Sequence, residues 1–575
     1  MGAAASQAAA PAGTDDLELR EKEPEDIELD TWTRLPPLPC AEPGSAEAEF
    51  CVTYINTRLG RDPALAGRLP LAGGAPALFN ACSDGVLLCK LLNTCAPDSI
   101  DERAVNLPTA AAATPASQSC EDALQNCELA LNAARAAGCS LSAVAAEDVA
   151  SGSEAAISEC LWQFIRLGVL QGVSVRDAPA LAALRRPGED VPALLDAPPE
   201  QLLLRWLAHH LAAAGPAWDA WLPLRDMGAE LADSTALACL LGQIAPELAP
   251  VSVQGEPSLL ARAEAVRTAA AEVTSEMLPP ARAIAEGNAH LNVVLLAALF
   301  RARPALGALG AAGEQTQLAA GLEEYSLEDS REERTFRVWL QSLLRDEVAL
   351  RSLAEGLRDG YWLLRVLDAL APGAVDWRTA HRPPLKPLLR RPLSIENCNQ
   401  VVRIARRLLG LPLVNIGGVD IVGGRTKLLA AILWQLMRFH TRALLQSIAP
   451  PGRRITDAEL DRFVLSWANA RAAAGGKARR IGSFSDPSLA SGLFLVDQLS
   501  AIEPGSVNFA LVTPGGTPAE RELNAKYLIS SARKMGCLIF LLWEDVVEVN
   551  SRMLLVFVAS LMVHTAARAE SRETA

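Results

Sequence analysis

The segment that most invites a chemical interpretation is a glycine cluster, NIGGVDIVGGRTKLL, at residues 415–429. A phosphate-binding loop needs Gly, four residues and then Gly-Lys-Ser/Thr, so that backbone amides and a lysine hold the phosphates. Here Val419 stands where the first glycine of that motif must be, and no strand pattern precedes the segment. We therefore predict a turn with left-handed glycines ahead of a helix, and no phosphate-binding loop.

Other groups of residues that could form a metal site or a catalytic site also lack essential members. The six histidines are dispersed, and neither they nor the twelve cysteines show the spacing of a metal site. Asp98, Asp101 and Glu102 resemble paired acids, but no base or nucleophile accompanies them, so we interpret them as a solvated loop. No calcium-binding loop, nucleophile elbow, dinucleotide fingerprint or kinase signature occurs. We expect neither an enzyme nor a bound metal or cofactor.

Composition narrows the class of protein. The 575 residues carry a formal charge of −14, which argues against nucleic acid or an anionic lipid surface as a partner. Cysteines scattered singly, with no leader sequence, predict a reducing compartment and a cytoplasmic protein. The longest apolar runs, such as 553–563, fall short of the ~18 residues that suggest a membrane span, so we expect none.

Residues 1–45 are interpreted as an acidic, disordered tail. The chain begins MGAAAS, which matches the pattern for myristoylation at Gly2. We favour a chance match, because the tail is rich in alanine and an anionic leaflet would repel the acidic stretch 15–30.

One pattern recurs four times along the rest of the chain. A pair of turn residues is followed thirteen residues later by proline, across an apolar run: Asp84-Gly85 to Pro97, Asp233-Ser234 to Pro246, Asp359-Gly360 to Pro372 and Ser491-Gly492 to Pro504. Each copy is preceded by an amphipathic helix with one aromatic core residue, namely Tyr54, Trp206, Trp339 or Trp467. Each copy closes with a helix that is apolar on nearly every face, at 157–170, 291–300, 428–437 and 553–563. The sequence therefore predicts an all-α protein of four domains, each built around its last helix.

Odd and even copies differ, which predicts a duplicated two-domain module. The first and third share an Asn-Cys pair, at 126–127 and 397–398, and a Trp-Gln pair in the closing helix, at 162–163 and 434–435. The second and fourth have small residues there, near Ala297 and Ala559. The order is A–B–A–B, so the chain carries two copies of whatever a tandem pair binds.

The segments DGVLLCKLLN, APDSIDERAVN and LWQ resemble a calponin-homology domain. Four such domains in this order, with SIENCNQVVRIA and LNAKYLISSARKMGC, are similar to the fimbrin/plastin family of actin-bundling proteins. The resemblance implies a cytoplasmic monomer on the actin cytoskeleton, with filamentous actin as its partner and two tandem actin-binding modules. It implies calponin-homology domains at 46–172, 199–304, 330–445 and 456–567, an inter-module linker at 305–329 and a C-terminal tail at 568–575.

In this family the filament is held by the first and last helices of the type 1 domain and the first helix of the type 2 domain. Carried over by position, these helices are 50–59, 159–171, 201–211, 333–344, 428–445 and 460–471. The resemblance then implies ten outward-facing actin-binding candidates: Asn56, Arg58, Gln163, Arg166, Arg205, His209, Arg337, Gln341, Arg438 and Arg442.

Two departures from the family bear on function. Family members typically carry N-terminal EF-hands, which the tail lacks, so calcium control is not expected. The loop after Asn106, LPTAAAATPASQS, lacks the family's lysines, and that loss would weaken the first module's hold on actin. The alternative to bundling is a single working module, or a scaffold for another cytoskeletal partner such as microtubules.

Overall fold

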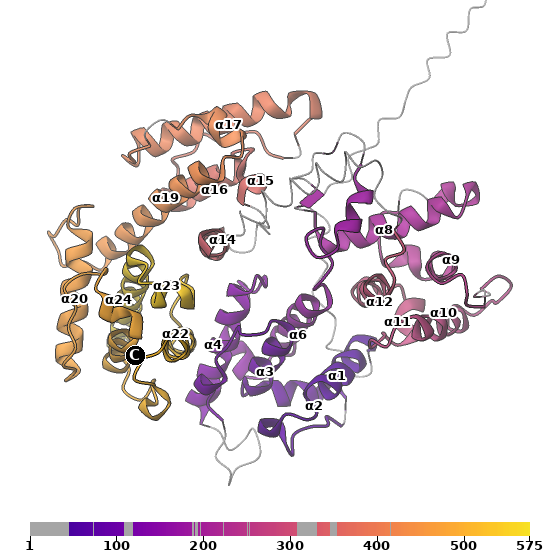
Figure 1. Cartoon of the computed structure of the whole chain (residues 1–575), viewed down its shortest axis with the longest axis horizontal. Coiled ribbons are helices and arrows are strands. Elements are labelled where there is room, and N and C mark those ends of the chain that lie inside the picture. The colour runs from indigo at the N-terminus through magenta and orange to yellow at the C-terminus, as the bar shows by residue number, and fades with distance from the viewer. Residues whose placement is uncertain are drawn as a thin grey trace, which may run out of the picture.

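Figure 1 shows the computed structural model of the chain, whose described part is helical. The structure describes residues 45–574 except 73, 108–118, 187–188, 190–193, 196, 222–223, 250, 252, 307–330, 345–352, 384 and 414–415. Within these ranges no β-strand forms, and one isolated bridge joins Ala66 and Leu69. Gly2 and its tail, the lysine-poor loop 108–118 and almost all of the linker 305–329 lie outside the described residues.

Six α-helices are described in the first domain: α1 (Ala46–Leu59), α2 (Ala75–Cys82), α3 (Val86–Cys95), α4 (Cys120–Ala136), α5 (Ala146–Ala150) and α6 (Glu154–Val169). Ser153 begins α6 by accepting a hydrogen bond from the amide N–H of Ala156. Ile157, Phe164 and Ile165 of α6 are fully buried. The closing helix is therefore the centre of this domain, as its apolar faces predict.

The second and fourth domains repeat this plan with fewer described helices. The second contains α8 (Pro199–Ala213), α9 (Thr235–Ile244), α10 (Leu259–Val273), α11 (Ala281–Ala285) and α12 (Ala289–Ala302). The fourth contains α20 (Leu460–Ala474), α21 (Leu493–Ile502), α22 (Pro518–Lys534), α23 (Trp543–Val547) and α24 (Ser551–Thr574). Every residue of α12 from His290 to Phe300 is buried, so this closing helix too is a core helix.

The third domain contains α14 (Arg331–Leu344), α15 (Leu353–Leu357), α16 (Tyr361–Leu370), α17 (Arg390–Arg407), α18 (Gly418–Val422) and α19 (Thr426–Ser447). Trp339 of α14 and Leu433 of α19 are fully buried in its core. The described part of the glycine cluster forms α18 and the turn before α19, where Gly424 has a φ of +65°. The predicted left-handed turn is therefore confirmed at Gly424.

The recurring turn pair begins an equivalent core helix in every domain. The residues just before α3, α9, α16 and α21 all have left-handed backbones, with φ of +73°, +64°, +76° and +72° at Gly85, Ser234, Gly360 and Gly492. Asn126 holds the first turn: its Nδ2 donates to Asp84 O at 3.0 Å, and its Oδ1 accepts the amide N–H of Asn106 at 2.8 Å. The Asn-Cys motif therefore contributes its asparagine as a clamp.

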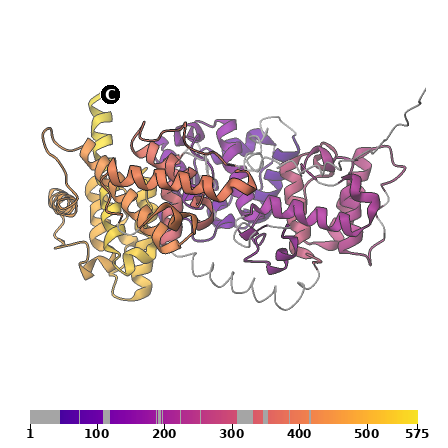
Figure 2. The same cartoon turned by 90° about the horizontal axis from the view of Figure 1, so that it is seen from above.

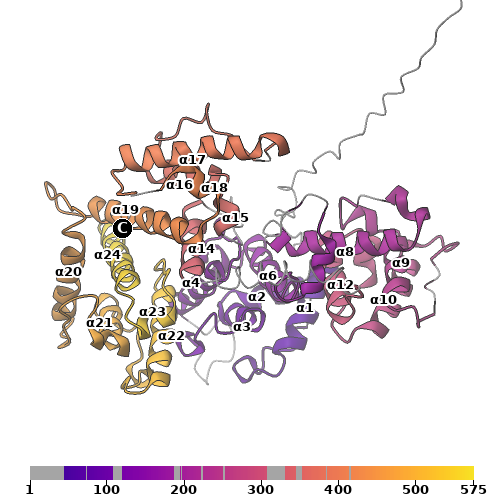
Figure 3. The same cartoon turned by 45° about the horizontal axis from the view of Figure 1, so that its top comes forward.

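The two modules fold back on each other, so that the first domain lies against the fourth (Figure 1). Helix α4 of the first domain packs on α22 of the fourth. Seen from above, the fourth domain lies at one end and the second at the other, with the first and third between them (Figure 2). The tilted view of Figure 3 shows α14 of the third domain beside this contact.

Helix α24 is longer than the 553–563 run. Its 20 residues Ser551–Glu570 include an 18-residue window with a mean hydropathy of 1.4, which by length and composition would suit a membrane span. Half of that window is buried, with Leu554, Val558 and Leu561 fully enclosed. It packs against α19 and α20 and takes the place that α12 has in the second domain. Helices α2 and α3 reach the length and hydropathy of a membrane span only when taken together, and the two are bent by 94° relative to each other.

Candidate functional site

Two candidates of the first module, Arg166 and Arg205, link separate parts of that module. Arg166, on α6, donates from Nε to Glu200 Oε1 on α8 at 2.7 Å, and Glu200 is 2% exposed. Arg205, one turn further along α8, makes a two-pronged ion pair with Glu189 in the connecting segment, with both distances 2.9 Å. These arginines therefore join elements of the module to each other.

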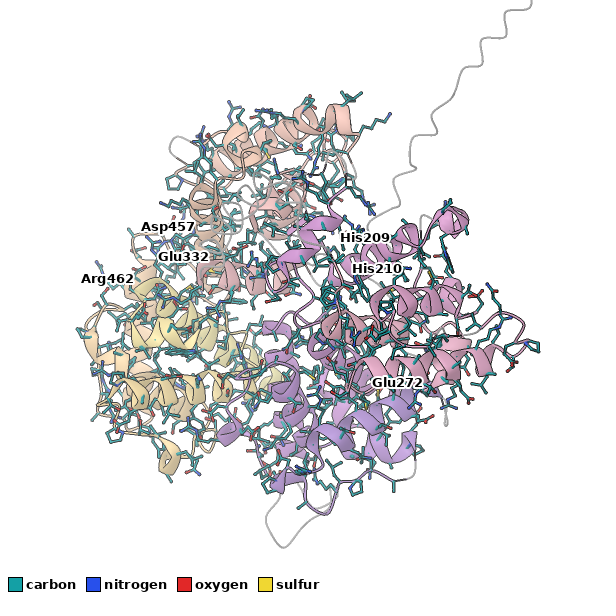
Figure 4. All side chains as sticks on the ribbon, turned by 45° about the vertical axis from the view of Figure 1, so that its right-hand side comes forward. His209, His210, Glu272, Glu332, Asp457 and Arg462 are labelled. Atoms are coloured by element: carbon teal, nitrogen blue, oxygen red, sulfur yellow. The ribbon has the colours of Figure 1, made fainter. Side chains whose placement is uncertain are left out.

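The second module repeats the first of these contacts. Arg438, on α19, donates from Nη2 to Asp461 Oδ1 on α20 at 3.1 Å and to Asp457 O at 2.9 Å. Arg442 Nε lies 3.3 Å from Asp457 Oδ1. Figure 4 labels Asp457 beside Arg462 at the edge of the fourth domain. Both carboxylates are largely exposed. The contact between the two domains of the second module (its domain seam) is therefore open to solvent here, unlike the buried domain seam of the first module.

The Trp-Gln pairs also face the domain seams. The ring of Trp162 meets the edge of His290 on α12, with ring centres 4.5 Å apart. In the second module the guanidinium of Arg552, on α24, lies 5.3 Å from the ring centre of Trp434. Gln163 itself donates to Glu159 at 2.8 Å within α6. The tryptophans that mark the odd domains therefore pack on the closing helices of the even ones.

Only Arg58 and His209, of the ten candidates, are exposed, and the other eight are half-buried. His209 lies on α8 beside the buried His210, as Figure 4 shows. Asn56 has a structural role, since its Oδ1 accepts the amide N–H of Leu71 at 2.7 Å and its Nδ2 donates to Leu71 O at 3.2 Å. Arg58 and His209 are therefore the candidates most open to a partner.

Arg337 and Gln341 lie on the inner side of the molecule. Both line a cavity of about 660 Å³ that α14 shares with the first and fourth domains. The modules fold back on each other and partly cover this side of α14, so both residues are half-buried, and the expectation that they face outward stays a prediction. Their role in binding a partner stays a prediction.

The sequence reasoning missed the contact between the first and fourth domains. Arg103 donates from Nη1 to Leu511 O at 3.0 Å and from Nη2 to Leu523 O at 2.6 Å, and its guanidinium lies 5.3 Å from the ring centre of Tyr527. Lys534 donates to Asn106 Oδ1 at 3.0 Å, and burial lowers the pKa of its ammonium group. The sequence of α22 gave no local signal of this contact, because its end, SSARK, is polar and charged, and yet Ser530, Ser531, Arg533 and Lys534 are all buried.

The acids singled out from the sequence have structural partners. Asp101 caps a short 3₁₀ turn and pairs with Arg103, and Glu102 accepts from Lys90 Nζ at 2.6 Å. Burial raises the pKa of the Cys82 and Cys89 thiols well above the usual range, which keeps both protonated. Within the described part of the chain, no group of three or more His, Cys, Asp or Glu side chains could hold a metal ion.

Comparison with known proteins matches this architecture. The calponin homology (CH) domain family matches residues 51–169, 197–305, 330–442 and 458–567. Fimbrin-5 of Arabidopsis thaliana is 37% identical over 519 residues, covering 90% of this chain and 72% of that protein. Plastin-3 of Rattus norvegicus is 34% identical over 524 residues, covering 89% and 78%.

A solved structure agrees with these relatives. The crystal structure of the actin-crosslinking core of Schizosaccharomyces pombe fimbrin aligns with a TM-score of 0.71 at 32% identity, covering 90% of this chain and 99% of that one. The exact domain bounds inferred from the sequence stay predictions. With four calponin homology domains and such relatives along nine-tenths of its length, the chain belongs to the fimbrin/plastin family.

Proposed function

We propose that this chain cross-links actin filaments into bundles, with each module holding one filament. The observation that carries the proposal is the pairing of four calponin homology domains into two like modules, as in the actin-crosslinking core of S. pombe fimbrin. Two binding modules in one chain are the minimum for a cross-link, and the first contact raises the effective concentration of the second.

The helices at the domain seams are the proposed actin-binding surface. Arg58 on α1 and His209 on α8 offer exposed groups on two elements of the first module. A chain with a net charge of −14 needs such local basic and apolar contacts to approach an acidic filament. Arg166, Arg205, Arg438 and Arg442 would contribute at the edges of the seams, where their ion pairs leave them half-buried.

We further propose that the chain works as a calcium-independent monomer of the cytoplasmic actin cytoskeleton, without catalysis. Helix α24 supports a protein with no membrane span, because its apolar residues are enclosed by the fourth domain and by α19. Calcium independence is a proposal from the sequence, in which no D-x-D-x-D-G calcium-loop pattern occurs.

Paired co-sedimentation with actin filaments tests the proposal. We expect the full chain to pellet actin at low speed, where only bundles sediment, equally in calcium and in a calcium chelator. Arg58→Glu should reduce bundling, while Arg407→Glu, an exposed arginine on α17 outside the proposed surface, should not. A chain that stays in the supernatant at both speeds would contradict actin binding.

A one-module actin binder is the second candidate. The lysine-poor sequence of the loop 108–118 favours it, because fewer cations there weaken attraction to an acidic filament. Co-sedimentation at high speed without low-speed bundles would identify this case. Arg58→Glu would then leave high-speed binding unchanged, since the second module would carry all of it.

A further inference from the structure

A buried arginine with no acidic partner lies where three domains meet. Arg533, near the end of α22, is only 9% exposed. Its Nη1 donates to Ser99 O of the first domain at 3.2 Å, while its buried Nε has no hydrogen-bond partner. Burial lowers the pKa of Arg533 to about 10, and within the described ranges no carboxylate opposes that effect. A guanidinium stays charged at neutral pH, so its burial without a counter-charge is strongly unfavourable.

Arg533 borders a cavity of about 480 Å³ between the first, third and fourth domains. Arg135 lines it from α4 and Gln341 lines it from α14, and no Asp or Glu is among the described residues around it. The guanidinium of Arg135 donates to Leu141 O, Val144 O and Asn132 Oδ1, all of them neutral acceptors. The cavity therefore holds two arginines and no negative charge in its lining.

Acidic residues near this cavity are already engaged or lie outside its lining. The adjoining 660 Å³ cavity shares Arg533 and Gln341 and includes three acids. These are engaged with basic neighbours: Asp101 with Arg103, Asp98 with Lys526 and Glu544 with Arg334. Glu128, which is close enough to Arg135 to be influenced by it, lies outside the lining, and burial raises its pKa. None of these carboxylates neutralises Arg533.

We propose that this cavity binds a small oxyanion of the phosphate class, held by Arg533 and Arg135, with the Gln341 amide as a neutral donor. Arginine suits such a ligand, because its planar group of N–H donors matches the acceptor oxygens of a phosphate. The anion would supply the counter-charge that Arg533 lacks.

The position of the site predicts what the anion does. Its three donors come from the fourth, first and third domains, so it can bind only while these domains are together. By mass action such a ligand stabilises the closed arrangement. That arrangement covers Arg337 and Gln341 on α14, so the anion would oppose release of the second module's proposed actin surface.

Thermal unfolding of the full chain tests the site without actin. At constant ionic strength, with chloride as the reference, we expect inorganic phosphate or pyrophosphate at ten times its Kd to raise the first midpoint by about 2 °C or more. Arg533→Met should abolish this shift. This substitution should not prevent folding, because it replaces an uncompensated buried charge with an apolar side chain of similar length.

Gln341→Glu provides a second, independent variant. It places a carboxylate in the cavity with little change of shape, so we expect a raised midpoint in chloride and no response to phosphate. Arg407→Met, an exposed arginine that lines neither cavity, should respond like the natural chain. A response to pyrophosphate alone would support a diphosphate ligand.

The proposal is overturned if neither anion shifts the natural chain, or if Gln341→Glu and Arg533→Met keep the full shift. If Arg533→Met does not fold, Gln341→Glu still decides the question. Because no actin is present, failure here leaves the proposed cross-linking untouched, and a failure to bundle actin leaves this anion site untouched.

Discussion

At the scale of single residues, one arginine has the same position in both modules but different surroundings. Arg166 and Arg438 each stand four residues after the tryptophan of a Trp-Gln pair and reach the first helix of the next domain. The side chain of Glu200 is 3% exposed, whereas that of Asp461 is 64% exposed. Burial makes the first contact the stronger one, because solvent screens the second.

Glu200→Gln and Asp461→Asn form a matched pair that measures this difference. We expect Glu200→Gln to cost about 1.5–3 kcal/mol, the range for a hydrogen bond to a charged group. Asp461→Asn should cost less than about 1 kcal/mol, as for exposed ion pairs. Calorimetric unfolding of the full chain checks both values, and equal losses would contradict the argument.

Asp359 predicts a local dependence of stability on pH. Its side chain is half-buried beside the turn into α16, and the desolvation that this brings raises its pKa to about 6 from 3.8. Between these values the folded state binds more protons than the unfolded state, so the contribution of Asp359 to stability falls as pH rises. It is fully protonated at low pH and most costly above pH 6.

Asp359→Asn should remove this dependence while keeping an acceptor for the amide N–H of Tyr361, now 2.9 Å from the carboxylate. Relative to the natural chain, we expect the variant to gain up to about 3 kcal/mol in free energy of unfolding between pH 4 and pH 7. Denaturation curves at several pH values check this. Parallel curves for the two proteins would show that Asp359 titrates normally.

At the scale of elements, the left-handed turn before each core helix is the most constrained repeated feature. A Cβ on Gly360 would lie 2.8 Å from Cys398 Sγ and 2.9 Å from Cys398 N, because α17 packs directly on the turn. Ser234 occupies the equivalent position before α9 with a φ of +64°, and its buried Oγ has no hydrogen-bond partner. The second domain therefore tolerates a strained residue where the third requires glycine.

Exchanging these residue types should have opposite effects. We expect Ser234→Gly to stabilise the second domain by about 1 kcal/mol, since it relieves a left-handed Cβ and a buried hydroxyl. Gly360→Ser should destabilise the third by about 2 kcal/mol or more through overpacking and strain. Urea denaturation measures both, and Ser234→Ala, which keeps the Cβ, separates strain from the lost hydroxyl.

At the scale of the whole molecule, the contact between the first and fourth domains limits how far Arg337 and Gln341 on α14 are exposed. Arg103 makes two hydrogen bonds to the fourth domain and stacks on Tyr527. Loss of these contacts by Arg103→Ala should favour the open arrangement by about 3 kcal/mol, or roughly 100-fold in the equilibrium constant.

Small-angle X-ray scattering of the free chain checks this prediction. We expect a larger radius of gyration for Arg103→Ala, and stronger actin bundling because Arg337 and Gln341 become exposed. Arg303→Ala, which breaks an exposed ion pair with Glu247 inside the second domain, is the control. Unchanged scattering together with unchanged bundling would contradict a closing role for this contact.

The sequence by itself determined the four helical units, their A–B–A–B order and their core helices. Apolar periodicity and turn pairs are local signals, and Trp206 and Trp339 are fully buried as that periodicity requires. Local patterns did not reveal that Asn524 clamps the fourth domain's turn as Asn126 clamps the first, since no cysteine follows it. Tertiary structure alone decided that Gln341 lines the cavities between domains and that Arg533 is buried. Both outcomes depend on contacts between residues hundreds of positions apart, which the apolar period of a helix does not encode.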